Sequence, residues 1–184
     1  MEDYKNLLTA PSGVFTIEDE KEVMEIVQRF ADECGWSSEL LLMDDVPERP
    51  LLRMDMGALG KVQVGTTVEL EMIHPDDKNL FVMAQLAVGV FDNVPKEHAA
   101  EVMRACNRLN AQVMAGTFGI KEELLFFRHP VILRPDFPLE ASVQMLVDGI
   151  INLHQAIDMT IDGLAVITQG MMTLEETIEA GYLE

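Results

Sequence analysis

Residues 95–168 decide the fold of this chain: PKEHAAEVMRACNRLNAQVMAGTFGIKEELLFFRHPVILRPDFPLEASVQMLVDGIINLHQAIDMTIDGLAVIT. Apolar residues recur here three and four positions apart, then form two short runs, then recur at helical spacing over a long stretch. The first and last patterns are typical of amphipathic helices, and the two runs are typical of paired strands. The stretch therefore predicts a helix, a hairpin of 117–120 with 124–132 across a charged turn, and one long helix.

Proline and glycine set the expected limits of these elements. Pro95 fits the first turn of the first helix, where its missing N–H has no helical partner to lose, and Gly116 is expected to end that helix. Pro138 starts the long helix and Gly170 breaks it. Pro130 cannot donate to a sheet ladder, so the strand of 124–132 is expected to lie at an edge or to bend there.

Upstream of residue 95 the pattern predicts one helix and a group of strands. Thr16 has the character of an N-cap, with Asp19 at the capping-box position and Gly35 as a left-handed stop. Residues 62–72 alternate between apolar and polar side chains, which indicates a strand with one wet face. Residues 80–90 are apolar on both faces and predict a central or doubly covered strand. Shorter apolar runs at 40–43 and 51–56 complete the expected sheet.

Thr173 and Glu176 form a second capping-box pattern, which predicts a short C-terminal helix at about 173–180 closed by Gly181. Strands are not separated one by one by helices, so the fold class is α+β, with an antiparallel sheet packed by helices in the order α-β(3-4)-α-β-β-α. We expect a lead-in segment over 1–15 and a single domain over 16–184.

The charge excludes whole classes of partner. Thirty-two acidic residues oppose thirteen Lys and Arg, for a formal net charge of −19. Nucleic acid and anionic membrane surfaces need clustered cations, so neither is an expected partner. The acidity serves solubility or a basic partner. The N-terminal residues lack an apolar signal segment, and the uncharged run 79–91 is too short to span a bilayer. We expect a cytoplasmic protein.

No pattern in the chain predicts catalysis, a cofactor or a metal site. The four histidines make no HxxxH or HExxH pair, and neither Cys34 nor Cys106 has a CxxC neighbour. Both cysteines are expected on the apolar stripes of helices. His154 and Asp158 lie four residues apart on one helix face. They could form half of a metal site or a general-base pair, or the Asp could simply provide a hydrogen-bond partner for the His. Arg128, His129 and Arg134 suit either an anion or a solvated strand end.

A resemblance enters at the CNRLN segment of 106–110, the strand start at 116–118 and the LLFFR segment of 124–128, followed by the long apolar helix. Together they resemble the YbjN-like family, described as sensory transduction regulators and related in fold to type III secretion chaperones. The resemblance implies a homodimer, a curved sheet packed by helices, and a protein or peptide ligand on an apolar surface. It implies no catalytic residue. Asn107, Asn110 and Gly116 match at the helix–strand junction, where the amides bond local backbone or contact a ligand.

Methionine is the residue type that we connect with function. The chain has thirteen, and unbranched thioethers either fill a core poor in aromatics or form adaptable binding surfaces. Met171-Met172 is the pair expected to be exposed; the others include Met43, Met54, Met56, Met72, Met83, Met103, Met114, Met145 and Met159. The predicted function is a non-enzymatic protein- or peptide-binding module; the alternatives are a small-molecule-binding regulator and, less favoured, an enzyme. The candidate partner-binding residues are Met171, Met172, Phe127, Arg128 and Val131.

Overall fold

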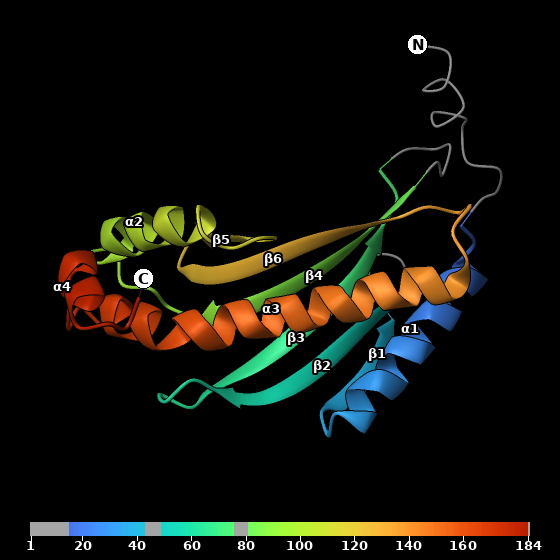
Figure 1. Cartoon of the computed structure of the whole chain (residues 1–184), viewed down its shortest axis with the longest axis horizontal. Coiled ribbons are helices and arrows are strands. Elements are labelled where there is room, and N and C mark those ends of the chain that lie inside the picture. The colour runs from blue at the N-terminus through green and yellow to red at the C-terminus, as the bar shows by residue number, and fades with distance from the viewer. Residues whose placement is uncertain (1–14, 43–48, 76–80, 184) are drawn as a thin grey trace, which may run out of the picture.

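The computed structural model describes residues 15–42, 49–75 and 81–183 of the chain. The predicted lead-in 1–15, apart from Phe15, lies outside these residues, as do Met43 and most of the expected turn after residue 74. In chain order the elements are α1 (Ile17–Glu33), β1 (Ser37–Leu42), β2 (Pro50–Leu59), β3 (Val64–Ile73), β4 (Val82–Phe91), α2 (Ala99–Asn110), β5 (Thr117–Lys121), β6 (Leu124–Leu133), α3 (Leu139–Thr168) and α4 (Leu174–Glu179) (Figure 1).

The six strands form one antiparallel sheet in the order β1-β2-β3-β4-β6-β5. The fold is therefore α+β, as the sequence predicts. β4 lies between β3 and β6, which explains why its sequence is apolar on both sides. No helix separates β1, β2, β3 and β4 in the chain order, and α2 then lies between β4 and the β5–β6 hairpin.

The hydrophobic core lies on one face of this sheet, which we call the inner face. Alternate residues of β2, β3, β4 and β6 are buried there, whereas the residues between them are half-buried or exposed. Helix α3 crosses the inner face and contacts β2, β4 and β6, with α1 beside it over β1 and β2 and α2 beside β5 (Figure 1). Within the described parts of the chain, no helix is long and apolar enough for a membrane span.

Both predicted capping boxes are present. The Thr16 hydroxyl accepts from the Asp19 N–H at 3.2 Å, and the Asp19 carboxylate accepts from the Thr16 N–H at 2.8 Å. Thr173 and Glu176 make the same reciprocal pair before α4. Each pair satisfies N–H groups that the first turn of a helix leaves without a partner.

The start and end of α2 differ from the prediction. The helix begins at Ala99 rather than near Pro95, because residues 96–98 form a separate turn after the proline. Just before it, the Val94 N–H donates to the carbonyl of Glu123 at 2.7 Å, which ties this segment to the β5–β6 turn. The helix ends at Asn110, so Gly116 (φ +91°) serves the entrance to β5 instead.

The connection between β2 and β3 is held by α3. Val62 lies in this turn rather than in β3, which begins at Val64. The Gly60 N–H donates to Oδ1 of Asp158, and the Val62 N–H donates to Oδ1 of Asp162, each at 3.0 Å. Two carboxylates one helical turn apart therefore fix a loop that is about a hundred residues away in sequence.

Pro130 lies in β6, which is an inner strand over its first half. β5 pairs only with residues 124–128, so beyond that point β6 has β4 as its partner, with Gln85 opposite Pro130. The edge position expected for Pro130 is thus confirmed, because among the described strands only β4 pairs with β6 at this residue. Cys106 is buried as expected, but Cys34 is exposed at the C-cap of α1, beyond the apolar stripe.

Candidate functional site

One hollow of the described structure is a mostly apolar groove of about 460 Å³ between α2, α3 and the segment after α4. We call it the α2–α3 groove. Its lining comes from the end of α2 and the loop after it, from the middle of α3, and from the segment after α4. The lining residues are Leu109, Gln112, Val113, Met114, Ala115, Asn152, Gln155, Ala156, Met159, Thr160, Gly181, Tyr182 and Leu183.

Asn110 fixes the wall that α2 and its following loop provide. Its side-chain amide donates to the carbonyl of Phe118 at 2.9 Å, and its Oδ1 accepts from the Phe118 N–H at 2.7 Å. This two-point contact anchors the end of α2 to the start of β5. Asn110 thus bonds the backbone across the helix–strand junction, and the intervening loop contributes Met114 to the lining of the groove.

The chain end provides the third wall because Gly163 of α3 has no side chain. A Cβ at this position would meet the side chain of Leu183 and the carbonyl of Tyr182. Leu183 is only 5% exposed, so the chain end packs directly on the helix. The close approach brings Tyr182 beside Met159 and Thr160 of α3 as groove lining.

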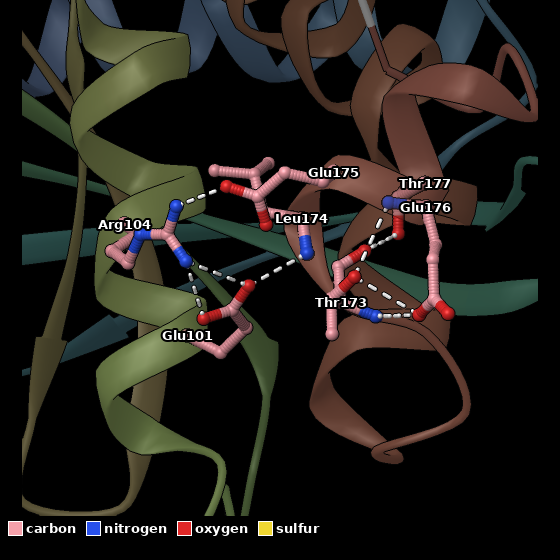
Figure 2. A network of polar contacts seen from close by, with 7 residues as sticks. All are labelled: Glu101, Arg104, Thr173, Leu174, Glu175, Glu176 and Thr177. Carbon is pink, nitrogen blue, oxygen red and sulfur yellow. Dashed lines mark hydrogen bonds and ion pairs between the residues drawn. The ribbon is translucent and has the colours of Figure 1, made fainter.

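A network of polar contacts holds α4 and the chain end against α2 (Figure 2). The carboxylate of Glu101 accepts from the Leu174 N–H at 2.7 Å and from the Arg104 guanidinium at 3.0 Å. Arg104 also pairs with Glu175, and this contact holds the pKa of the Glu175 carboxyl below its usual range. The C-terminal wall of the groove is thus attached by charge-assisted hydrogen bonds at the surface.

The described residues that line the groove carry no charge; Glu184, which follows Leu183, lies outside the described residues. None of these lining residues is acidic, basic or a histidine, although the chain as a whole carries a net charge of −19. Their polar groups are the amides of Gln112, Asn152 and Gln155 and the hydroxyls of Thr160 and Tyr182. The Thr160 hydroxyl donates to the carbonyl of Ala156 at 2.7 Å. Such a lining can bury an apolar ligand and orient it by a few hydrogen bonds.

Two exposed methionines stand at this groove. The side chain of Met114 is 96% exposed and that of Met159 is 73% exposed, whereas Met24 and Met54 are fully buried in the core. The methionines that the structure describes therefore divide between core filling and surface. Sequence reasoning named Met114 and Met159 among them but had no signal to single them out, because the groove joins three distant segments.

The predicted partner-binding residues are not brought together. Phe127 and Val131 are buried on the inner face, so we no longer place them on a binding surface; Arg128 points the other way, over the ring of Phe126 at 4.4 Å. Met171 is 62% exposed and Met172 is half-buried. Neither lines the groove, and their role in binding stays a prediction.

Gly116 and Asn107, the other two residues assigned to the helix–strand junction, have different surroundings. Gly116 has a positive φ, and a Cβ there would meet the ring of Phe127, so glycine is required for the strand to start beside that ring. Asn107 is exposed on α2. Its ligand role stays a prediction.

The residues weighed for chemistry have structural contacts instead. The His154 ring stacks on Trp36 with centroids 5.7 Å apart, and Asp158 accepts from the Gly60 backbone. Arg134 forms a bidentate pair with Asp136 at 2.8 and 2.9 Å. Burial raises the pKa of Cys106 to about 11, so its thiol stays protonated and unreactive at neutral pH. Among the residues that the structure describes, no group of three His, Cys, Asp or Glu is placed to hold a metal ion.

One buried ionisable contact has no counterpart in the sequence prediction. Glu20 of α1 is fully buried, and its Oε1 lies 2.5 Å from Nε2 of His74 at the end of β3. The contact joins α1 to the end of β3, and both of its residues are polar ones next to the apolar positions of these elements. Neither residue lines the α2–α3 groove.

Comparison with known proteins gives a structural match but no sequence match. No protein-family model matches the chain, and no curated protein matches its sequence. The structure is similar to the crystal structure of YbjN from E. coli, which is described as a candidate transcription regulator. The TM-score is 0.42 at 8% sequence identity, over 73% of this chain and 87% of that one.

Proposed function

We propose that this protein is a non-enzymatic binding module that holds an apolar helical segment of a protein partner in the α2–α3 groove. The observation that carries the proposal is the uncharged, methionine-edged lining in a strongly acidic chain. A groove between two helices suits the recognition mode in which an amphipathic helix buries its apolar face.

The exposed stripe of α3 supports this occupant. Residues 149–157 contain no acidic, lysine or arginine side chain, and Asn152, Gln155 and Met159 follow one another at helical spacing. Within residues 149–157 a partner helix buries alkyl and amide surface without removing a side-chain charge of that segment from water, whereas at Met159 it lies next to Asp158. Amides at the same stripe can bond polar residues at the edge of that helix.

A small-molecule ligand is the second candidate, because the volume of the groove lies within the range of ligand pockets. An open groove that includes a loop methionine at 96% exposure favours an extended partner over an enclosed ligand. The homodimer, the regulatory role and the cytoplasmic location remain predictions; light scattering on the purified chain tests the first of them.

The test uses a fluorescent amphipathic peptide of roughly 18 residues, about five helical turns, built from Leu, Ala and Gln without charged flanks. Anisotropy titrations compare the wild-type chain with Met159→Glu and Met171→Glu. Both methionines are exposed, so each variant keeps the core intact. Placing a charge in the groove should weaken binding about tenfold or more, which corresponds to 1.4 kcal/mol, while Met171→Glu should bind like the wild type.

Wild-type affinity in Met159→Glu would contradict the proposal. If Met171→Glu alone loses the peptide, the binding surface is the one around residues 171–172 instead. Thermal melts followed by circular dichroism show that both variants remain folded.

A further inference from the structure

The methionines at the groove are the most exposed ones of the described chain. Met114 and Met159 exceed Met171 at 62% and Met103 at 38%, and the core methionines Met24 and Met54 are inaccessible. Oxidation of methionine by peroxide follows exposure of the sulfur. The same two side chains that give the groove its apolar edge are therefore the ones that a peroxide reaches first.

We propose that Met114 and Met159 form a peroxide-sensitive modification site that closes the α2–α3 groove to apolar partners; this rests on the proposed function of the groove. Hydrogen peroxide transfers one oxygen to the thioether sulfur. The O–O bond breaks, an S–O bond forms and water leaves, so the sulfur loses two electrons and the peroxide gains them. A thiol-dependent methionine sulfoxide reductase reverses the step.

The polar lining of the groove provides a partner for the oxidised side chain. Gln155 precedes Met159 by four residues on α3, and side chains at this spacing are neighbours on a helix surface. The amide of Gln155 can donate to the sulfoxide oxygen, which is a far better acceptor than the thioether. Oxidation thus replaces an adaptable apolar contact by a hydrated, hydrogen-bonded group at the place where the partner helix would lie.

The first measurement is the order of oxidation in the folded full-length chain. Peptide mapping by mass spectrometry during a hydrogen peroxide time course should show Met114 and Met159 oxidised about tenfold faster than Met24 and Met54. Equal rates for the buried and the groove methionines would overturn the proposed site.

The second measurement is peptide binding after oxidation. The wild-type chain should lose affinity for the uncharged amphipathic peptide by about tenfold once Met114 and Met159 are oxidised, which corresponds to 1.4 kcal/mol. The double variant M114L/M159L keeps the apolar edge but cannot be oxidised there, and it should bind the peptide equally before and after peroxide. The matched control M103L/M171L removes the other two exposed methionines of the described residues and should respond like the wild type.

The outcomes separate this inference from the proposed function. If the reduced wild-type chain binds no peptide, the groove is not a docking site and both fail. If it binds, and the oxidised chain binds as well as the reduced one, the modification site fails and the binding function stands. Loss of binding in oxidised M114L/M159L would also refute the site, because it would place the sensitive sulfur elsewhere.

Discussion

His129 is a histidine that is buried in the core. It is 9% exposed on the inner face of β6, and its Nδ1 has no hydrogen-bond partner among the residues that the structure describes. Gly149 of α3 lies directly against it, because a Cβ at that glycine would come within 3.1 Å of the His129 ring, of Leu86 and of Val131. Burial lowers the pKa of His129, since the imidazolium form would lose its hydration there.

This burial makes stability depend on pH in a definite direction. The unfolded chain takes up the proton near the ordinary pKa of about 6.5, whereas the folded chain resists it until a lower pH. The free energy of unfolding contributed here is therefore complete above about pH 6.5 and falls as pH decreases toward the folded pKa. Urea unfolding at pH 7.5 and pH 5.5 measures this dependence. The free energy of unfolding should fall less between the two pH values in His129→Leu than in the wild type. Val131→Ala, in the same part of the core, should lower the free energy of unfolding at both pH values. The decrease between pH 7.5 and pH 5.5 should stay as large as in the wild type.

The amide of Asn110 provides a second test at the level of one residue. Replacing it with Ala leaves the Phe118 N–H and carbonyl without their side-chain partner, which should cost about 1–3 kcal/mol. Asn107→Ala, three residues earlier on the exposed face of α2, should change the free energy of unfolding by less than about 0.5 kcal/mol. Equal losses in the two variants would refute the anchoring role of Asn110.

At the scale of elements, the sequence predicts what is decided locally. The capping boxes at Thr16 and Thr173 are readable because the bonding partners are three residues apart. The orientation of β6 is not readable, because both of its faces carry large apolar side chains and hydrophobicity alone cannot say which one faces the core. That ambiguity placed Phe127 and Val131 on a binding surface. The α2–α3 groove escaped prediction for another reason: three segments far apart in sequence build it, and none is distinctive alone.

Attachment of α4 through Glu101 can be tested by hydrogen exchange. Glu101→Ala removes the acceptor of the Leu174 N–H and one partner of Arg104 (Figure 2). Local opening of α4 should become easier, so the amides of Leu174–Glu179 should exchange about tenfold faster while the sheet keeps its protection. Glu97→Ala, exposed in the turn before α2, is the matched control. Unchanged exchange in α4 would mean that apolar packing of Leu174 and Leu183 holds this segment without the polar network.

At the scale of the whole molecule, charge opposes the packing that the sheet and helices provide. With a net charge of −19 the folded chain repels itself, and salt should relieve the repulsion over a Debye length of about 10 Å at 0.1 M. Calorimetry should therefore show a higher Tm in 300 mM NaCl than in 20 mM. Changing Glu22 and Glu25, both exposed on α1, to Lys shifts the net charge by four to −15 and should reduce this salt dependence. A Tm that falls with salt would show that attractive pairs such as Arg53–Glu69 dominate instead.

The stretch of β6 that β5 does not cover has a consequence between molecules. Beyond residue 128 no strand of the described part of the chain pairs with this side of β6, and Ile132 is 45% exposed near the strand's end. An unprotected strand of this kind recruits a neighbouring chain into a shared ladder, and a proline discourages that growth by withholding a donor. Pro130→Thr would restore the donor, and we expect it to promote concentration-dependent clustering, visible as rising scattered light and thioflavin fluorescence while the wild type stays dispersed. We therefore expect Pro130 to disfavour strand pairing between copies of this chain.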